Sequence, residues 1–112
     1  MKVTLNVLER LAKYIGNVFC NYTSKVRIYI EDCSVDEYIL KYEDDNNITI
    51  RITIRENEFL MEYMLEDGTY KLCNAFSIDV IEEIYEFMFI VGIKIKAAED
   101  YIKQQISTER KI

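Results

Sequence analysis

The stretch ITIRITIRENEFLMEYMLEDGTYKL, residues 48–72, decides the fold of this chain. Isoleucines alternate with threonines and arginines over residues 48–55, which is the pattern of a strand with one buried face. A second alternating run follows at residues 59–65, and Asp67-Gly68 is a strong signal for a tight turn into a third run at residues 70–72. The stretch therefore predicts three consecutive antiparallel strands.

The hairpin turns predict how these strands pair. A two-residue turn at Glu56-Asn57 gives a register that satisfies both faces of the first hairpin, with apolar pairs on one face and opposite charges on the other. The expected pairs are Ile54–Phe59, Ile52–Met61, Ile50–Tyr63, Arg55–Glu58 and Arg51–Glu62. A two-residue turn at Asp67-Gly68 predicts the further pairs Leu65–Tyr70 and Tyr63–Leu72.

Further elements precede this stretch. Apolar residues recur at spacings of three and four over residues 4–20, which predicts an amphipathic helix that Thr4 can cap. Residues 25–31 and 38–42 alternate as half-buried strands do. We therefore expect an N-terminal helix followed by a five-stranded antiparallel meander.

The last third of the chain is open to two interpretations. An apolar stripe over residues 78–108, with Ser77 as its N-cap and lysines toward its end, predicts one long helix. Residues 87–96 are also rich in strand-forming residues, so a strand there is the alternative. With the helix, residues 1–112 form a single α+β domain: an N-terminal helix, a five-stranded antiparallel β-meander and a long C-terminal helix packed on one face of the sheet.

The composition restricts the chemistry that this chain can perform. It has 112 residues, a formal net charge of -6, no histidine and 3 glycines. The absence of histidine excludes Ser-His-Asp and Cys-His catalysis and His-ligated zinc. There is also no glycine-rich phosphate loop and no C-x-x-C pair. We therefore expect no enzymatic activity, no cofactor and no metal site.

Membrane insertion and secretion are not expected either. The longest apolar run, residues 87–93, is far shorter than the roughly 20 residues that cross a bilayer. Charged residues interrupt the N-terminal segment where a signal peptide would be apolar. These patterns predict an intracellular, cytoplasmic protein without membrane contact.

Acidic residues concentrate in the middle of the chain. Residues 36–86 hold 14 acidic and 4 basic side chains, while the two flanks together are net basic. Such a block attracts a basic protein surface and repels nucleic-acid phosphates, so we expect a basic protein partner and no direct nucleic-acid binding. The expected contact residues are Glu43, Asp44, Asp45, Glu58, Glu62, Glu66 and Asp67.

The same carboxylates have other interpretations. Residues 43–47 fit a plain turn better than a calcium loop, because Asx residues favour turns and the EF-hand spacing is missing. A catalytic carboxylate pair would have to come from Glu58, Glu62 and Glu66 on one strand face, where nearby arginines oppose the raised pKa that a general acid needs. A solvated surface with no partner is the simplest alternative.

The predicted final helix is apolar on more than one side. Phe87, Phe89, Ile90 and Ile93 lie largely off the stripe that would face the sheet. Either the first helix covers them or they form an exposed patch of the kind that marks interfaces. We expect this surface to form a homodimer or to bind another protein.

In layout alone, a small acidic chain with helices around an antiparallel sheet resembles virus-encoded inhibitors of host defence, including anti-CRISPR proteins and DNA mimics. The resemblance implies an anti-defence protein, encoded by a virus or mobile element, that inhibits a nucleic-acid-handling partner. The sequence thus favours a non-enzymatic acidic protein-binding module. A dimeric, chaperone-like assembly protein that uses residues 87–93 is the first alternative, and a small carboxylate- or metal-dependent enzyme is the second.

Overall fold

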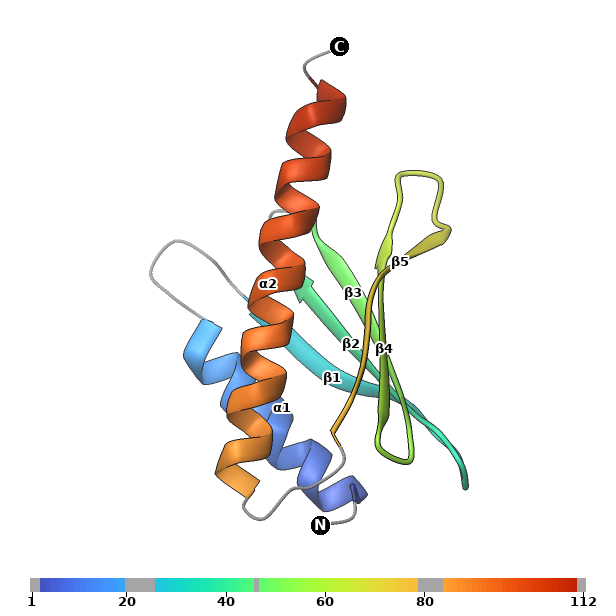
Figure 1. The fold of residues 1–112 in the computed structure, drawn as a ribbon, viewed down its shortest axis with the longest axis vertical. Helices are drawn as coiled ribbons and strands as arrows, with labels where there is room; N and C mark the ends of the chain where they lie inside the picture. Colours follow the sequence, from blue (N-terminus) through green and yellow to red (C-terminus); the bar gives the residue numbers. More distant parts are fainter. Residues whose placement is uncertain (1–2, 20–25, 46, 79–83, 111–112) are drawn as a thin grey trace.

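The computed structural model describes residues 3–19, 26–45, 47–78 and 84–110 and confirms the α+β architecture (Figure 1). Along the chain, one helix precedes and one follows a five-stranded antiparallel sheet, whose strands lie side by side in the order β1-β2-β3-β4-β5. The elements are α1 (Leu5–Phe19), β1 (Val26–Cys33), β2 (Tyr38–Asp44), β3 (Thr49–Arg55), β4 (Glu58–Met64), β5 (Tyr70–Ser77) and α2 (Ile84–Arg110).

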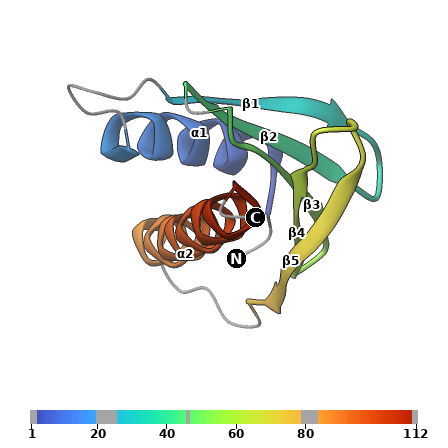
Figure 2. The ribbon, with the colours of Figure 1, turned by 90° about the horizontal axis from the view of Figure 1, so that it is seen from above.

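The sheet curves around both helices. Seen along the axis of α2, the strands form a bent wall, and α1 and α2 lie together on its concave side (Figure 2). The convex side carries no element of secondary structure among the described residues (Figure 2). Neither helix, over the residues described, is both long and apolar enough to cross a membrane.

The register of the β3–β4 hairpin is the predicted one. Ile50, Ile52 and Ile54 lie opposite Tyr63, Met61 and Phe59, and all six side chains are buried. They point toward the helices because apolar residues on alternate positions share one face of a strand. The concave face of this hairpin therefore forms the floor of the hydrophobic core.

The two helices fill the space above this floor. Leu8, Leu11 and Ile15 of α1 are fully buried, as are Val91 and Ile95 of α2. Thr4 caps α1 as expected, since its Oγ1 accepts a hydrogen bond from the Val7 amide at 3.3 Å. One core thus joins both helices to the sheet.

The predicted register of the β4–β5 hairpin is wrong near its turn. Leu65 pairs with Thr69 instead of Tyr70, through a 2.8 Å hydrogen bond from the Leu65 amide to the Thr69 carbonyl oxygen. A second bond, from Gly68 N to Leu65 O at 3.0 Å, closes a turn that ends on Gly68 with φ +86°. The loop therefore has three residues, which is the next most common hairpin geometry after the two-residue turn.

Bulges adjust the pairing of both edge strands. The expected Tyr63–Leu72 pair is absent, because Tyr63 lies opposite Lys71 and Leu72 lies opposite Glu62. Cys73 is one extra residue in β5 and forms a bulge. Beyond it, from Asn74 to Ser77, β5 pairs with β4 in the predicted register. At the other edge of the sheet, the β1–β2 register shifts in the same way around Glu31.

Residues 87–96 are helical, so the helix prediction is confirmed for this segment and the strand alternative is wrong. The predicted start of the helix is wrong at Ser77, which is the last residue of β5 and lies opposite Glu58. Residues 79–83, which fall within the predicted helix, lie outside the described residues. Strand β5 thus continues to Ser77, because Ser77 pairs with Glu58, the first residue of β4.

Two glycines give a matched test of this backbone. We expect Gly68→Ala to destabilise the protein by about 1 kcal/mol or more, because an alanine pays a steric cost at positive φ. Gly16→Ala lies inside α1 with open space around its new Cβ, so it should stabilise the protein by about 0.5–1 kcal/mol. Urea unfolding of both variants checks the pair, and equal shifts in one direction would contradict the turn geometry.

Candidate functional site

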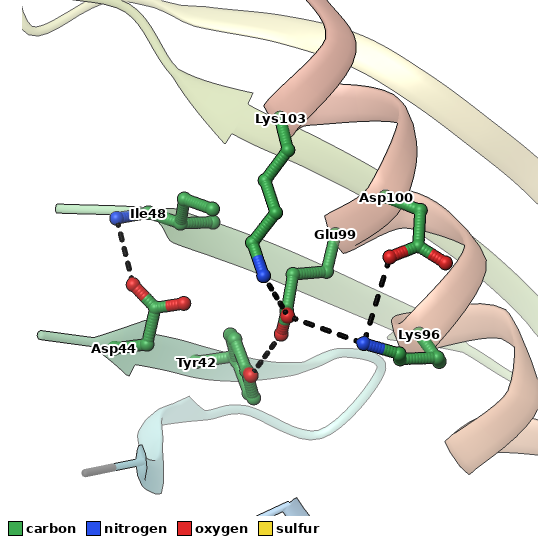
Figure 3. Close-up of polar contacts among 7 residues, drawn as sticks. All are labelled: Tyr42, Asp44, Ile48, Lys96, Glu99, Asp100 and Lys103. Carbon is green, nitrogen blue, oxygen red and sulfur yellow. Dashed lines mark hydrogen bonds and ion pairs between the residues drawn. The ribbon is translucent and has the colours of Figure 1, made fainter. Parts of the chain in front are cut away.

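A buried carboxylate links α2 to the sheet. Glu99 is 8% exposed, and its Oε2 accepts a 2.5 Å hydrogen bond from the Tyr42 hydroxyl of β2 (Figure 3). Its Oε1 accepts a 2.9 Å bond from Lys103 Nζ and lies 3.6 Å from Lys96 Nζ. Lys96 also lies 3.5 Å from Asp100 on the outer side of the helix. This arrangement satisfies a charge that would otherwise be costly to bury.

The environment of Glu99 fixes its charge state. Burial alone would raise the pKa of the Glu99 carboxyl, but hydrogen bonds from Tyr42 and Lys103 and the charges of Lys103 and Lys96 bring it below its ordinary value. Burial and the bond to Glu99 raise the pKa of the Tyr42 phenol far above its ordinary value. A carboxylate that these hydrogen bonds and charges keep ionised acts as a structural anchor and not as a general acid.

Sequence reasoning missed Glu99, although the chain carries a signal for it. The residue lies four positions after Ile95 and three before Ile102, both of which are buried on the stripe that faces the sheet. Lysines stand at positions 96 and 103, three before and four after it. A carboxylate on an apolar stripe with two adjacent lysines indicates a buried, paired charge.

The middle of the convex face carries ion pairs. Arg51 Nη2 lies 3.0 Å from Glu62 Oε1, as the predicted cross-strand pair requires. The Arg51 guanidinium also lies 3.9 Å from the centre of the Tyr70 ring of β5. Glu62, predicted to contact a partner, is therefore already engaged within the sheet.

A second group of charges lies toward the β1 edge of the same face. Lys41 Nζ lies 3.6 Å from Glu31 and 3.9 Å from Glu43. The Tyr29 hydroxyl donates a 3.0 Å hydrogen bond to Glu43 Oε1. Glu43 is thus half-buried beside a lysine, which weakens its field toward a partner.

Four other predicted contact residues gather at one end of the sheet, at the β2–β3 and β4–β5 turns. Asp44 accepts a 3.0 Å hydrogen bond from the Ile48 amide (Figure 3). Asp67 accepts bonds from Thr69 N at 2.9 Å and Thr69 Oγ1 at 2.6 Å, and these lower its pKa. Both carboxylates stabilise their own turns, whereas Asp45 and Glu66 are exposed.

The opposite end of the sheet holds a group of four acidic residues, most of which were not predicted from the sequence. Asp36 and Glu37 come from the β1–β2 loop, Glu56 from the β3–β4 turn and Glu58 from the start of β4. We call these four residues the acidic loop end. Only Glu58 was among the predicted contact residues. Alternate connections of an antiparallel meander meet at the same end, so the positions of the turns could have revealed the group.

Arg55 lies among these carboxylates. Its predicted cross-strand neighbour is Glu58, and the register places them opposite each other. The ion pair forms elsewhere, with Arg55 Nη2 2.6 Å from Glu37 Oε2. The hydrogen bond and charge of Glu37 raise the pKa of the Arg55 guanidinium. No ion pair to Asp36, Glu56 or Glu58 is present in the described part of the chain, and all three side chains are exposed.

Two hollows lie on either side of Arg55. The first, about 510 Å³, opens beside Glu37 and Glu58 over a floor that includes Thr53, Leu60 and Ala75. The second, about 890 Å³, opens beside Asp36 and Glu56 and is also lined by Val3, Val35, Tyr38 and Asn57. Each hollow combines carboxylates at the rim with apolar side chains, a lining that suits the long aliphatic stem and charged head of lysine or arginine.

Glu56 holds an unfavourable backbone conformation. Its φ is +55°, a region that glycine and asparagine occupy readily and that costs other residues about 1–2 kcal/mol. The tight β3–β4 turn imposes this conformation, because two-residue hairpin loops need a positive φ at their first central residue. The hairpin thus keeps a glutamate where glycine or asparagine would be less strained, beside the second hollow.

Only part of the predicted apolar surface of α2 is exposed. Phe87 is fully buried, with its ring centroid 5.8 Å from that of Phe59, so it cannot contact a partner. Ile90 is partly buried against the core. Phe89 and Ile93 are 59% and 51% exposed. Phe87 was misassigned because it borders the buried stripe, and the curved sheet reaches that far around the helix.

Neither metal ligands nor a cysteine pair appears in the described residues. No group of three or more cysteine, aspartate or glutamate side chains is placed there to hold a metal ion. Cys33 is exposed and Cys73 half-buried, both as free thiols, while Cys20 lies outside the described residues.

No protein-family model, curated protein or solved structure matches this chain. The chain's own geometry therefore carries the functional proposal.

The Glu99 anchor predicts a pH-dependent loss of stability. Glu99→Gln should destabilise the protein by about 1–2 kcal/mol at pH 7, since two lysines lose their counter-charge. The folded-state pKa of Glu99 is lowered, so its contribution is present above the ordinary glutamate pKa of about 4.3 and fades as the pH falls below it. Wild type and variant should therefore converge in acid.

Urea unfolding at neutral and acidic pH measures this difference. Asp100→Asn is the matched control, because it removes the exposed partner of Lys96 and should cost less than about 0.5 kcal/mol. A Glu99→Gln effect that is independent of pH would contradict the role of the ionised carboxylate.

Proposed function

We propose that this chain is a non-enzymatic protein-binding module whose acidic loop end docks onto a basic surface of a partner protein. The observation that carries the proposal is the pair of hollows around Arg55, lined by carboxylates from the β1–β2 loop, the β3–β4 turn and the start of β4. Three of those four carboxylates are exposed, so they can receive lysine or arginine side chains.

The apolar part of the site adds contact area to this attraction. Val35 is 99% exposed at the tip of the β1–β2 loop, beside Asp36. Leu60, at the floor of the first hollow, is 37% exposed. An interface usually combines a few apolar contacts with a charged rim that determines orientation and association rate. The acidic loop end supplies the charged rim, and Val35 and Leu60 beside it supply the apolar contacts.

The proposed partner belongs to the proteins that handle nucleic acid, because these present lysine- and arginine-rich surfaces. A module that occupies such a surface competes with phosphates and acts as an inhibitor. The exposed carboxylates of the hairpin turns lie at both ends of the sheet, and ion pairs occupy the face between them. Local docking by one end therefore fits this structure better than an extended imitation of a DNA backbone.

Charge reversal at the two ends of the sheet tests the proposal. The variant D36K/E56K/E58K should lose a partner that wild type captures from a cell lysate, because the rim of both hollows becomes basic. The control E9K/D45K/E66K has the same net charge and alters exposed residues elsewhere, so it should keep that partner. Capture should weaken as salt rises from ~0.05 M to ~0.3 M. Loss in the control alone, or equal behaviour of both variants, would sink the proposal.

Glu56 gives a sharper test, because stability and binding should change in opposite directions. Glu56→Gly relieves the positive φ and should stabilise the protein by about 1 kcal/mol while weakening the captured complex. Thermal unfolding and titration of the purified partner measure the two effects. A variant that is more stable and binds as tightly as wild type would show that the Glu56 carboxylate serves no partner.

A further inference from the structure

Besides the buried face that contacts the core, helix α2 carries an exposed apolar surface on the side away from the sheet. Tyr85, Phe89 and Ile93 are 66%, 59% and 51% exposed. They recur at every fourth position and therefore lie along one side of the helix. The buried residues Val91 and Ile95 mark the opposite side, which faces the core. We call Tyr85, Phe89 and Ile93 the outer ridge.

The outer ridge is complementary to itself when two copies of α2 pack antiparallel. With the two-fold axis at the level of residue 91, Phe89 of one copy lies beside Ile93 of the other, and Tyr85 lies over the small Ala97. The same register places Glu86 of each copy opposite Lys96 of the other, so the pair forms twice. Glu86, Lys96 and Ala97 are all exposed, and Lys96 can reach Glu86 of the other copy while its ammonium stays near Glu99 and Asp100 of its own helix.

Among the described residues of α2, the charges favour this register over the neighbouring one. If the axis moves by half a turn to the level of Ile93, Glu86 faces Asp100 instead, and like charges meet on both sides of the interface. Apolar contact along the ridge alone would allow either arrangement. The pair Glu86–Lys96 therefore supplies the specificity that a ridge of three apolar residues lacks.

We infer that the outer ridge joins two copies of this chain into an antiparallel α2–α2 homodimer, with Glu86 of each copy paired to Lys96 of the other. Residues of the acidic loop end take no part in the ridge, so the dimer does not rest on the proposed function. Its formation would place two acidic loop ends on one particle.

Light scattering and sedimentation of the full chain test the inference. Wild type should be a dimer, and Phe89→Glu should be a monomer, because it puts a charge at the centre of the ridge. Leu72→Glu is the matched control, since it changes an equally exposed apolar residue on the convex face of the sheet and should remain dimeric.

The register is tested by two single charge reversals. E86K and K96E should each weaken dimerisation about tenfold or more alone, because each homodimer then opposes like charges. K96E also removes one of the two lysines beside Glu99, so the mixture of the two variants is the deciding measurement. An equimolar mixture should form a heterodimer, since the lysine introduced in one copy meets the glutamate introduced in the other. Recovery in the mixture also shows that both variants are folded. A monomeric wild type, a dimeric Phe89→Glu variant or a mixture that stays monomeric would overturn the inference.

Discussion

The alternation of side chains along the β3–β4 hairpin is the constraint on which the rest of this structure depends. Because successive residues of a strand point to opposite faces, one register puts Ile50, Ile52 and Ile54 against the helices and Arg51 against Glu62 on the outside. A slip of one residue would exchange the two faces completely. The core, the position of both helices and the charged convex face all follow from this single alignment.

The buried Glu99 cluster adds a different kind of specificity to the apolar core. Hydrophobic packing alone tolerates several positions of a long helix, because apolar contacts have no preferred direction. The carboxylate finds its donors only where α2 meets Tyr42 of β2 and keeps Lys103 beside it. Displacement of the helix by one turn would take the Glu99 carboxylate away from the Tyr42 hydroxyl and leave it only the lysines of its own helix, so this bond favours one position of α2 along the sheet.

Much of the fold could be predicted from the sequence, because its strongest signals are local and periodic. The alternation in β3 and β4 determined the register of that hairpin, and the three- and four-residue spacings located both helices. The β4–β5 pairing could not be predicted, because Asp67-Gly68 is compatible with two turn lengths and the bulge at Cys73 leaves no pattern in the residues. The start of α2 was misplaced for a related reason: Ser77 is a good N-cap wherever it occurs, and only its pairing with Glu58 makes it a strand residue.

The candidate site was harder to predict than the fold, because it depends on which loops meet in space. Glu58 was identified from the charge pattern, while Asp36, Glu37 and Glu56 became one group only through the meander topology. The choice of Glu37 over Glu58 as the partner of Arg55 depends on the path of the β1–β2 loop. The sequence indicated how much negative charge the middle of the chain carries, and the fold determined where that charge lies.

The bulges at Glu31 and Cys73 have a consequence for the protein in a crowded cell. Both lie on edge strands, β1 and β5, where unpaired backbone groups could template the addition of a strand from another molecule. A bulge breaks the regular spacing of those groups and increases the local twist, so a flat incoming strand finds few aligned partners. The two bulges therefore disfavour the addition of a further strand at either edge of the sheet, and with it runaway cross-β aggregation.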